Sequence, residues 1–134
     1  MSHPTATIVR TVTEGQFLGK RHDITAAGFT PTPHTRLIVA GGGSVNDTLL
    51  TLISNVFGMD VYRASSGNAA ARGAALLAFA GVHGLERMEE LASRDEFELV
   101  SKANHQLYET YGGMREKYVD LQKRYLESGK KNVV

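Results

Sequence analysis

Cysteine is absent from the 134-residue sequence, so a disulfide framework and thiol chemistry are both excluded. An excess of charge is also lacking: the formal net charge at pH 7 is +1, which gives no argument for nucleic acid, a membrane surface or an acidic partner. No apolar run approaches membrane-spanning length, and the N-terminus lacks the basic-then-apolar pattern of a signal peptide. These absences predict a soluble, cytoplasmic protein with no nucleic-acid or membrane partner.

Sequence patterns for catalysis and metal binding are lacking as well. No glycine-rich loop ends in Lys-Ser or Lys-Thr, no serine lies in a nucleophile-elbow motif, and no pair of carboxylates is placed for acid–base catalysis. We therefore expect no catalytic residue in this chain. We also expect no metal site, because the five histidines are scattered without ligand spacing: His3, His22, His34, His83 and His105.

The most informative stretch that is present is a glycine turn between a predicted strand and a predicted helix. Leu37–Ala40 is a short, unbroken apolar run, typical of a strand buried on both faces. Gly41–Gly43 then remove every side chain, so the backbone can turn sharply and a flat ligand can approach it. Ser44 or Asn46 can cap the helix that follows, which we expect over 45–57.

This order of elements favours a binding site. In α/β proteins a nucleotide or phosphate binds where a strand leads through a glycine turn into a helix, because free N–H groups and the helix dipole face the turn. The alternative is a tight turn that exists for packing alone and binds nothing.

The elements around the turn predict an α/β fold. Because 42% of the residues are hydrophobic, we expect the chain to bury one core. We expect a helix over Thr5–Asp23 with a solvated polar face, a linker over 26–35, and a second strand, parallel to the first, over Met59–Arg63. Ala69–Ala80 is apolar nearly all round and predicts a buried helix between two neighbours. Its one charge, Arg72, is expected to reach an edge or a phosphate-bearing cleft.

The last third of the chain predicts less regular structure. We expect an exposed turn of helix and a loop over Leu85–Leu99, with its acidic residues far from the glycine turn. A surface helix packed on its own domain follows, because apolar residues recur at four-three spacing from Leu107 to Tyr125. Residues 128–134 are expected to fray.

Two alternatives to a phosphate- or nucleotide-binding turn remain open. A dinucleotide fingerprint would need a glycine at Asn46 and an acidic residue at Arg63, although an arginine there could suit NADP and a degenerate unit of that type. The other alternative is a non-catalytic α/β interaction module that uses an exposed strand edge or the last helix.

Three segments together resemble a known family. Val39-Ala-Gly-Gly-Gly-Ser-Val-Asn46, Ile53-Ser-Asn-Val-Phe-Gly-Met-Asp-Val-Tyr62 and Ala70-Ala-Arg-Gly-Ala-Ala-Leu-Leu-Ala78 look like the C-terminal part of the FGGY carbohydrate kinases. Within that family they are most similar to the xylulokinases. The resemblance extends from about Ile8 to Leu126.

The resemblance implies part of an actin-like ATPase (RNase-H-like) domain: a βαβα core with flanking N- and C-terminal helices. It implies a site for ATP, with Mg²⁺ in the full-length enzyme, at Gly41, Gly42, Gly43 and Asn46. The glycine backbone would lie near the α-phosphate and ribose, and Asn46 would hydrogen-bond the adenine or ribose side. The helix over Ala69–Ala80 would pack at the hinge between two domains, although Arg72 replaces a residue that is usually aliphatic.

The resemblance also implies a fragment of a longer enzyme. Residues 1–35 would form a helix and linker, 36–81 the nucleotide-binding core, and 82–134 an acidic loop and tail helix. The full-length enzyme would transfer a phosphoryl group from ATP to D-xylulose or a related sugar, and the sugar would bind only through the missing N-terminal part. We expect the chain alone to be inactive and, with two strands and exposed edges, to self-associate.

Overall fold

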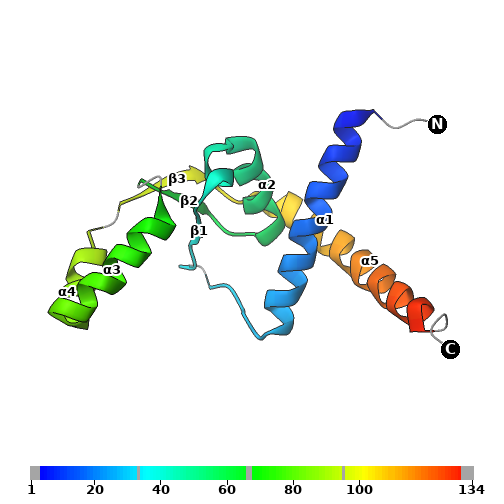
Figure 1. Cartoon of the computed structure of the whole chain (residues 1–134). Coiled ribbons are helices and arrows are strands. Elements are labelled where there is room, and N and C mark those ends of the chain that lie inside the picture. The colour runs from blue at the N-terminus through cyan, green and yellow to red at the C-terminus, as the bar shows by residue number, and fades with distance from the viewer. Residues whose placement is uncertain (1–3, 33, 66–67, 95, 131–134) are drawn as a thin grey trace. The chain divides into compact units, whose positions relative to one another are not determined.

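The computed structural model describes residues 4–32, 34–65, 68–94 and 96–130, and it separates into two compact units (Figure 1). The helical unit comprises the described parts of Met1–His34, Asn55–Gly58 and Ala103–Val134. The sheet unit comprises the described parts of Thr35–Ser54 and Met59–Lys102. The class predicted from the sequence, α/β, is confirmed, with five α-helices and three strands in the described residues.

The sheet unit is built on a mixed sheet with the strand order β1-β2-β3. Strands β1 (Leu37–Val39) and β2 (Val61–Ala64) are parallel, as the sequence predicted, and their register sets Val39 opposite Arg63. Strand β3 (Phe97–Ser101) pairs antiparallel with β2. The prediction of a loop up to Leu99 was therefore wrong at its end, where apolar and polar residues alternate in Phe97-Glu-Leu.

The first strand differs from its prediction in burial. In the described sheet β1 lies at the edge, and the side chain of Ile38 is 47% exposed. The prediction of burial on both faces was wrong, because the face of β1 that carries Ile38 is not fully covered by another described element. Complete burial occurs instead in β2, where Val61 is 0% exposed.

The helix after the glycine turn begins later than predicted. A short 3₁₀ helix, η1 (Gly42–Val45), precedes α2 (Asp47–Phe57). Apolar side chains at helical spacing bury one face of α2, and Leu50 and Val56 are both 0% exposed. Gly58 then ends the helix with φ +66°, a conformation that glycine adopts without strain.

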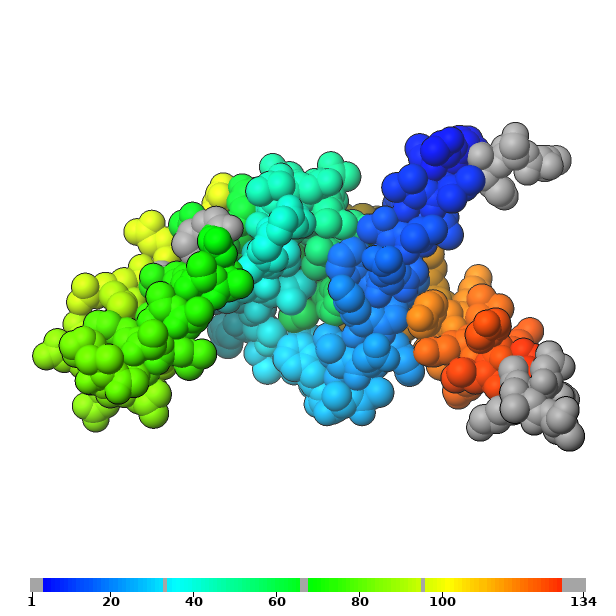
Figure 2. Space-filling model, viewed as in Figure 1, coloured from blue at the N-terminus to red at the C-terminus, as the bar shows by residue number. Residues whose placement is uncertain are grey.

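The small-residue helix α3 (Ala69–His83) is paired with α4 (Leu85–Ala92), which the sequence predicted only as a single turn. The prediction that α3 is buried was wrong: α3 has no buried residue, and Leu77 is 71% exposed. Figure 2 shows this pair, in green, open to solvent on the viewed face. Arg72 lies against α4, where Nη2 donates a hydrogen bond to the Leu91 carbonyl at 3.3 Å.

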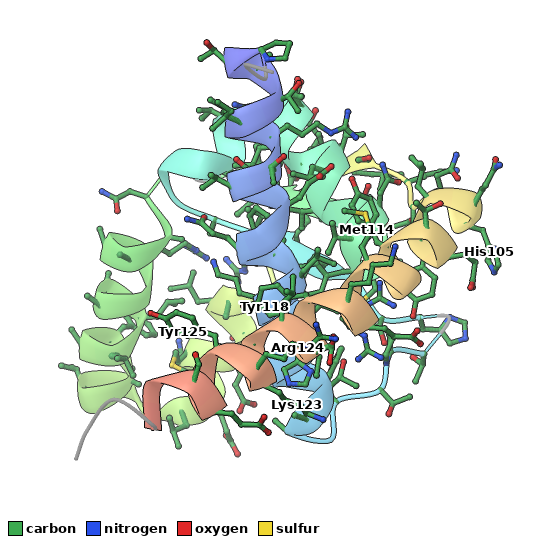
Figure 3. All side chains as sticks on the ribbon, turned by 90° about the vertical axis from the view of Figure 1, so that its right-hand side faces the viewer. His105, Met114, Tyr118, Lys123, Arg124 and Tyr125 are labelled. Atoms are coloured by element: carbon green, nitrogen blue, oxygen red, sulfur yellow. The ribbon has the colours of Figure 1, made fainter. Side chains whose placement is uncertain are left out.

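The helical unit consists mainly of α1 (Thr5–Ala26) and α5 (His105–Lys130), which cross (Figures 1 and 3). Tyr118 of α5 packs at Gly19 of α1, where an added Cβ would lie 2.8 Å from the Tyr118 hydroxyl oxygen. Glu14 is only 9% exposed and accepts hydrogen bonds from Arg10 and from the Tyr111 hydroxyl, each at 2.8 Å. The predicted solvated polar face of α1 was therefore wrong at Glu14.

The same unit contains the end of α2. Arg21 Nη1 donates to the Val56 carbonyl at 2.9 Å, and the Arg21 guanidinium stacks 4.1 Å from the centre of the Tyr108 ring. This pairing satisfies an orphan carbonyl at the helix C-terminus and places a positive charge there. Arg21 also belongs to the helix for which a solvated polar face was predicted, and this contact shows that the prediction was wrong at Arg21.

The long helix α5 packs over its first half and is exposed beyond it. Tyr111 is 4% exposed, whereas Leu121 is 64% and Tyr125 78% exposed. The helix continues to Lys130, past the point where fraying was predicted, and residues 131–134 lie outside the described part of the chain. None of the helices described here is both long and apolar enough to cross a membrane.

Candidate nucleotide-binding turn

The candidate site is the turn between β1 and α2, and its first residue has a conformation suited to glycine. Gly41 has φ +87°, in the left-handed region where a Cβ is strained. Its carbonyl accepts two hydrogen bonds from Ser44, one from the backbone N–H at 3.0 Å and one from Oγ at 2.7 Å. The turn is therefore held closed from within.

The middle of the turn is bare backbone. All three glycines are exposed, and a Cβ added at Gly42 would meet no atom within 4 Å. At Gly43 it would touch only Leu49 Cδ2, at 3.4 Å. A flat group could therefore lie against Gly42 without displacing any described part of the protein.

Asn46 caps α2, as the sequence predicted. Its Oδ1 accepts a hydrogen bond from the Leu49 N–H at 3.0 Å, so an N-terminal donor of the helix is satisfied. Since Oδ1 serves as the cap, a ligand would be recognised through the Nδ2 amino group of Asn46. The predicted residues Gly41, Gly42, Gly43 and Asn46 are thus all exposed and lie in one turn, residues 41–46.

A charged cluster that the sequence analysis missed lies beside the turn. Arg63, at the end of β2, donates from Nη1 to the Ser44 carbonyl at 3.1 Å and to Asp47 Oδ1 at 3.0 Å. Its Nη2 pairs with Glu98 Oε2 at 2.9 Å. These bonds raise the pKa of Arg63, first through Glu98 and then through Asp47.

The cluster overturns the expectation that the acidic residues lie far from the turn. Glu98 comes to the turn because β3 pairs with β2 and sets it opposite Arg63. Arg63 was already singled out from the sequence by its position, since the carboxyl ends of neighbouring parallel strands meet at one edge of a sheet, but its partners were not. Glu98 could be placed only by the antiparallel pairing of β3, which the sequence analysis did not predict.

The cluster offers neither a free base nor a Mg²⁺ site. Both of its carboxylates are ion-paired with Arg63, and nowhere in the described ranges do three His, Cys, Asp or Glu side chains gather as metal ligands. Magnesium takes carboxylate oxygens in octahedral geometry, which these paired groups do not fit. What the turn offers chemically is binding through backbone and amide groups.

Comparison with known proteins identifies the family of the chain. The family model for the C-terminal domain of the FGGY family of carbohydrate kinases matches residues 1–82. The xylulose kinase of Rattus norvegicus is 30% identical over 125 residues, which cover 91% of this chain and 23% of that protein. Xylulose kinase 2 of Arabidopsis thaliana is 47% identical over 73 residues, 54% of this chain and 13% of that protein.

The chain thus spans about a quarter or less of the length of these curated relatives. The family model, however, matches more than half of the chain, and it includes the whole segment from β1 to β2. On this evidence the chain belongs to the FGGY family of carbohydrate kinases, within the C-terminal domain.

Proposed function

We propose that this chain is the ATP-binding C-terminal segment of a xylulose kinase-like sugar kinase. Gly41, Gly42 and Gly43 would lie against the nucleotide near its α-phosphate and ribose, and Asn46 would hydrogen-bond its adenine or ribose side. The complete enzyme would transfer the γ-phosphoryl group of ATP to xylulose or a related sugar. The family match and the two xylulose kinase relatives support this proposal.

One observation carries the proposal: the turn between β1 and α2 is exposed backbone with open space over Gly42. Open space at Gly42 suits a ligand that approaches the main chain closely. An actin-like arrangement of the complete domain is inferred from the family and is part of the same proposal.

Other parts of the reaction would be supplied from outside the turn. Phosphoryl transfer needs an in-line acceptor hydroxyl, a base and metal-bridged phosphates. Asp47 and Glu98 are held by Arg63, so neither is placed as a base, and Mg²⁺ would be bound by other groups. We therefore expect the chain alone to show no xylulose-dependent ATP consumption in a coupled assay. A turnover number of about 1 s⁻¹, which is usual for kinases, would contradict the expected inactivity of the chain.

Gly42→Ala tests the site directly. The added methyl group meets nothing in the protein, and removing a glycine stiffens the unfolded chain, so stability should stay constant or rise by about 0.4–1 kcal/mol. Binding of ADP, followed through backbone amide shifts of residues 41–46, should weaken because the methyl group would meet the ligand.

Gly73→Ala is the matched control, because a Cβ at Gly73 in α3 also meets nothing within 4 Å. It should leave ADP binding unchanged. Equal ADP binding by wild type and Gly42→Ala, or ADP shifts confined to residues elsewhere, would overturn the proposal.

The same titration separates the two alternatives. A dinucleotide site of NADP type would use Arg63 for the 2′-phosphate, but its guanidinium already pairs with two carboxylates. NADPH should therefore bind no more tightly than ADP. An interaction module would give no shift at the turn with either nucleotide.

A further inference from the structure

The cluster of Arg63, Asp47 and Glu98 has no part in the ATP contacts proposed above. It joins three elements at the edge of the turn: the end of β2, the start of α2 and the beginning of β3. The Arg63 side chain is 24% exposed, whereas those of Asp47 and Glu98 are 72% and 63% exposed. The arginine is therefore the inner member, and the carboxylates face solvent beside the turn.

Arg63 also reaches the backbone of the turn itself. Its Nη1 donates to the Ser44 carbonyl, and Ser44 in turn donates twice to the Gly41 carbonyl. This series of hydrogen bonds connects the end of β2 to the first glycine. A turn fixed in this way before a ligand arrives loses less conformational entropy on binding.

The charges beside the turn matter for an anionic ligand. Arg63 cancels one of the two carboxylate charges, so the cluster carries a net charge of −1; without Arg63 it would carry −2. Two uncompensated carboxylates near nucleotide phosphates would repel them, and such repulsion weakens with salt.

We infer that Arg63 is a positioning residue for the nucleotide: it fixes the glycine turn through the Ser44 carbonyl and shields the phosphates from Asp47 and Glu98. This inference rests on the proposed function. Arg63 acts through the turn and its neighbours and makes no contact with the ligand.

The test uses ADP as an anionic probe and adenosine as a neutral probe on the same chain. Arg63→Met removes the charge and every hydrogen bond of the guanidinium. We expect ADP affinity at low salt to fall about tenfold, the scale of one added charge near the ligand. Adenosine affinity should fall less, because only the positioning of the turn is lost. High salt should recover part of the loss for ADP.

Two further variants separate charge from position. Arg63→Met combined with Asp47→Asn and Glu98→Gln removes the repulsion, so ADP affinity should rise again at low salt while the loss for adenosine remains. Arg63→Lys keeps the charge but cannot reach three partners, so it should preserve ADP binding better than Arg63→Met. Arg94→Met, which removes the exposed pair between Arg94, just after α4, and Glu90 of α4, is the matched control and should change neither affinity.

Several results would overturn the inference. An equal, salt-independent loss for both probes would make Arg63 a general support of the fold, and unchanged ADP binding would remove its role altogether.

If Arg63→Met does not fold by circular dichroism, Glu98→Gln decides instead: it should raise ADP affinity, and a fall would contradict the electrostatic part. If wild type binds neither probe, the proposed function fails. Faster amide exchange at residues 42–46 in ligand-free Arg63→Lys would still support the positioning of the turn.

Discussion

Three asparagines begin helices in the same way in this chain. Asn46, Asn68 and Asn104 each accept, through Oδ1, a hydrogen bond from the backbone N–H three residues on, at 3.0, 3.2 and 3.1 Å. Capping alone therefore gives no sign of a ligand. Asn46 differs because a bare glycine turn precedes it, and this difference allows its two roles to be separated by mutation.

We predict that Asn46→Ser keeps the helix cap but loses the amide donor. The free energy of unfolding should change little, because serine is as good a cap as asparagine, while ADP binding weakens by about 1–3 kcal/mol. Asn46→Ala should lose both the helix cap and the amide donor, and the lost cap should lower the free energy of unfolding by about 1 kcal/mol. Urea unfolding and nucleotide titration measure the two effects.

Asn68→Ala is the control, because it removes an equivalent cap from α3. It should cost similar stability without changing ADP binding. Unaltered ADP affinity in Asn46→Ser would show that Asn46 serves only as a cap.

Residue patterns predicted the cap at Asn46 but missed the cluster around Arg63. A cap depends on neighbours within one turn, which the sequence lists in order. Arg63 and Glu98 are 35 residues apart and meet only through the register of β2 and β3. No local pattern reports that register.

At the scale of elements, the end of α2 depends on close packing at one glycine. Gly58 has φ +66°, and a Cβ there would overlap the Tyr108 ring. Gly28, after α1, also has a positive φ of +90° but has open space around it. Comparing the same substitution at Gly58 and at Gly28 therefore separates the effect of backbone strain from that of steric overlap.

Gly58→Ala should destabilise the chain more than Gly28→Ala. Both variants place a side chain in the left-handed region, which destabilises the fold by about 1–2 kcal/mol. Only Gly58→Ala must also displace an aromatic ring, which adds about 1–3 kcal/mol of destabilisation. Urea unfolding of both variants measures the difference. Equal losses would mean that the Tyr108 ring moves away freely.

The crossing of α1 and α5 contains a buried polar pair, Glu14 and Tyr111, which gives a second prediction at this scale. Tyr111→Phe removes the only hydroxyl that donates to this carboxylate among the described contacts, and should cost about 1–3 kcal/mol at neutral pH. Gly112→Ala, in open space on the same helix, is the control and should instead raise the free energy of unfolding by about 0.5–1 kcal/mol, because alanine favours the helix over glycine.

The pH dependence follows from the tyrosine. Burial, and then the hydrogen bond to Glu14, raise the pKa of Tyr111 above 10.0. The protonated hydroxyl therefore stabilises the fold fully below pH 10 and loses this effect as the pH rises through the raised value. The difference in the free energy of unfolding between wild type and Tyr111→Phe should therefore narrow as the pH rises above 10. A constant difference would rule out this linkage.

Hydrophobic periodicity predicted the elements themselves better than their surroundings. Helices α1, α2, α3 and α5 and the parallel pair β1–β2 follow from local patterns of apolar residues. The prediction of a buried α3 failed because composition reports what a helix can pack against, whereas burial depends on which neighbours are present. In the sheet unit, α4 covers one side of α3 and leaves Leu77 exposed.

For the whole molecule, exposed apolar side chains predict self-association. Leu77 and Val82 of α3 and Leu85 of α4 are 71%, 78% and 66% exposed, and β1 is an open sheet edge. Such surfaces recruit partners. We expect the isolated chain to be at least a dimer by light scattering at micromolar concentration. Leu77→Ser with Val82→Ser should lower the mass, and a wild-type monomer that unfolds cooperatively would contradict the prediction.

The hydrogen bond between Glu14 and Tyr111 joins residues that are 97 positions apart. A ribosome adds about 5–20 residues per second, so roughly 5–20 s of synthesis separate the two side chains. During that interval α1 is complete but its partner helix does not yet exist, and its inward face, with Leu18, remains uncovered. The helical unit can therefore form only after α5 has been synthesised.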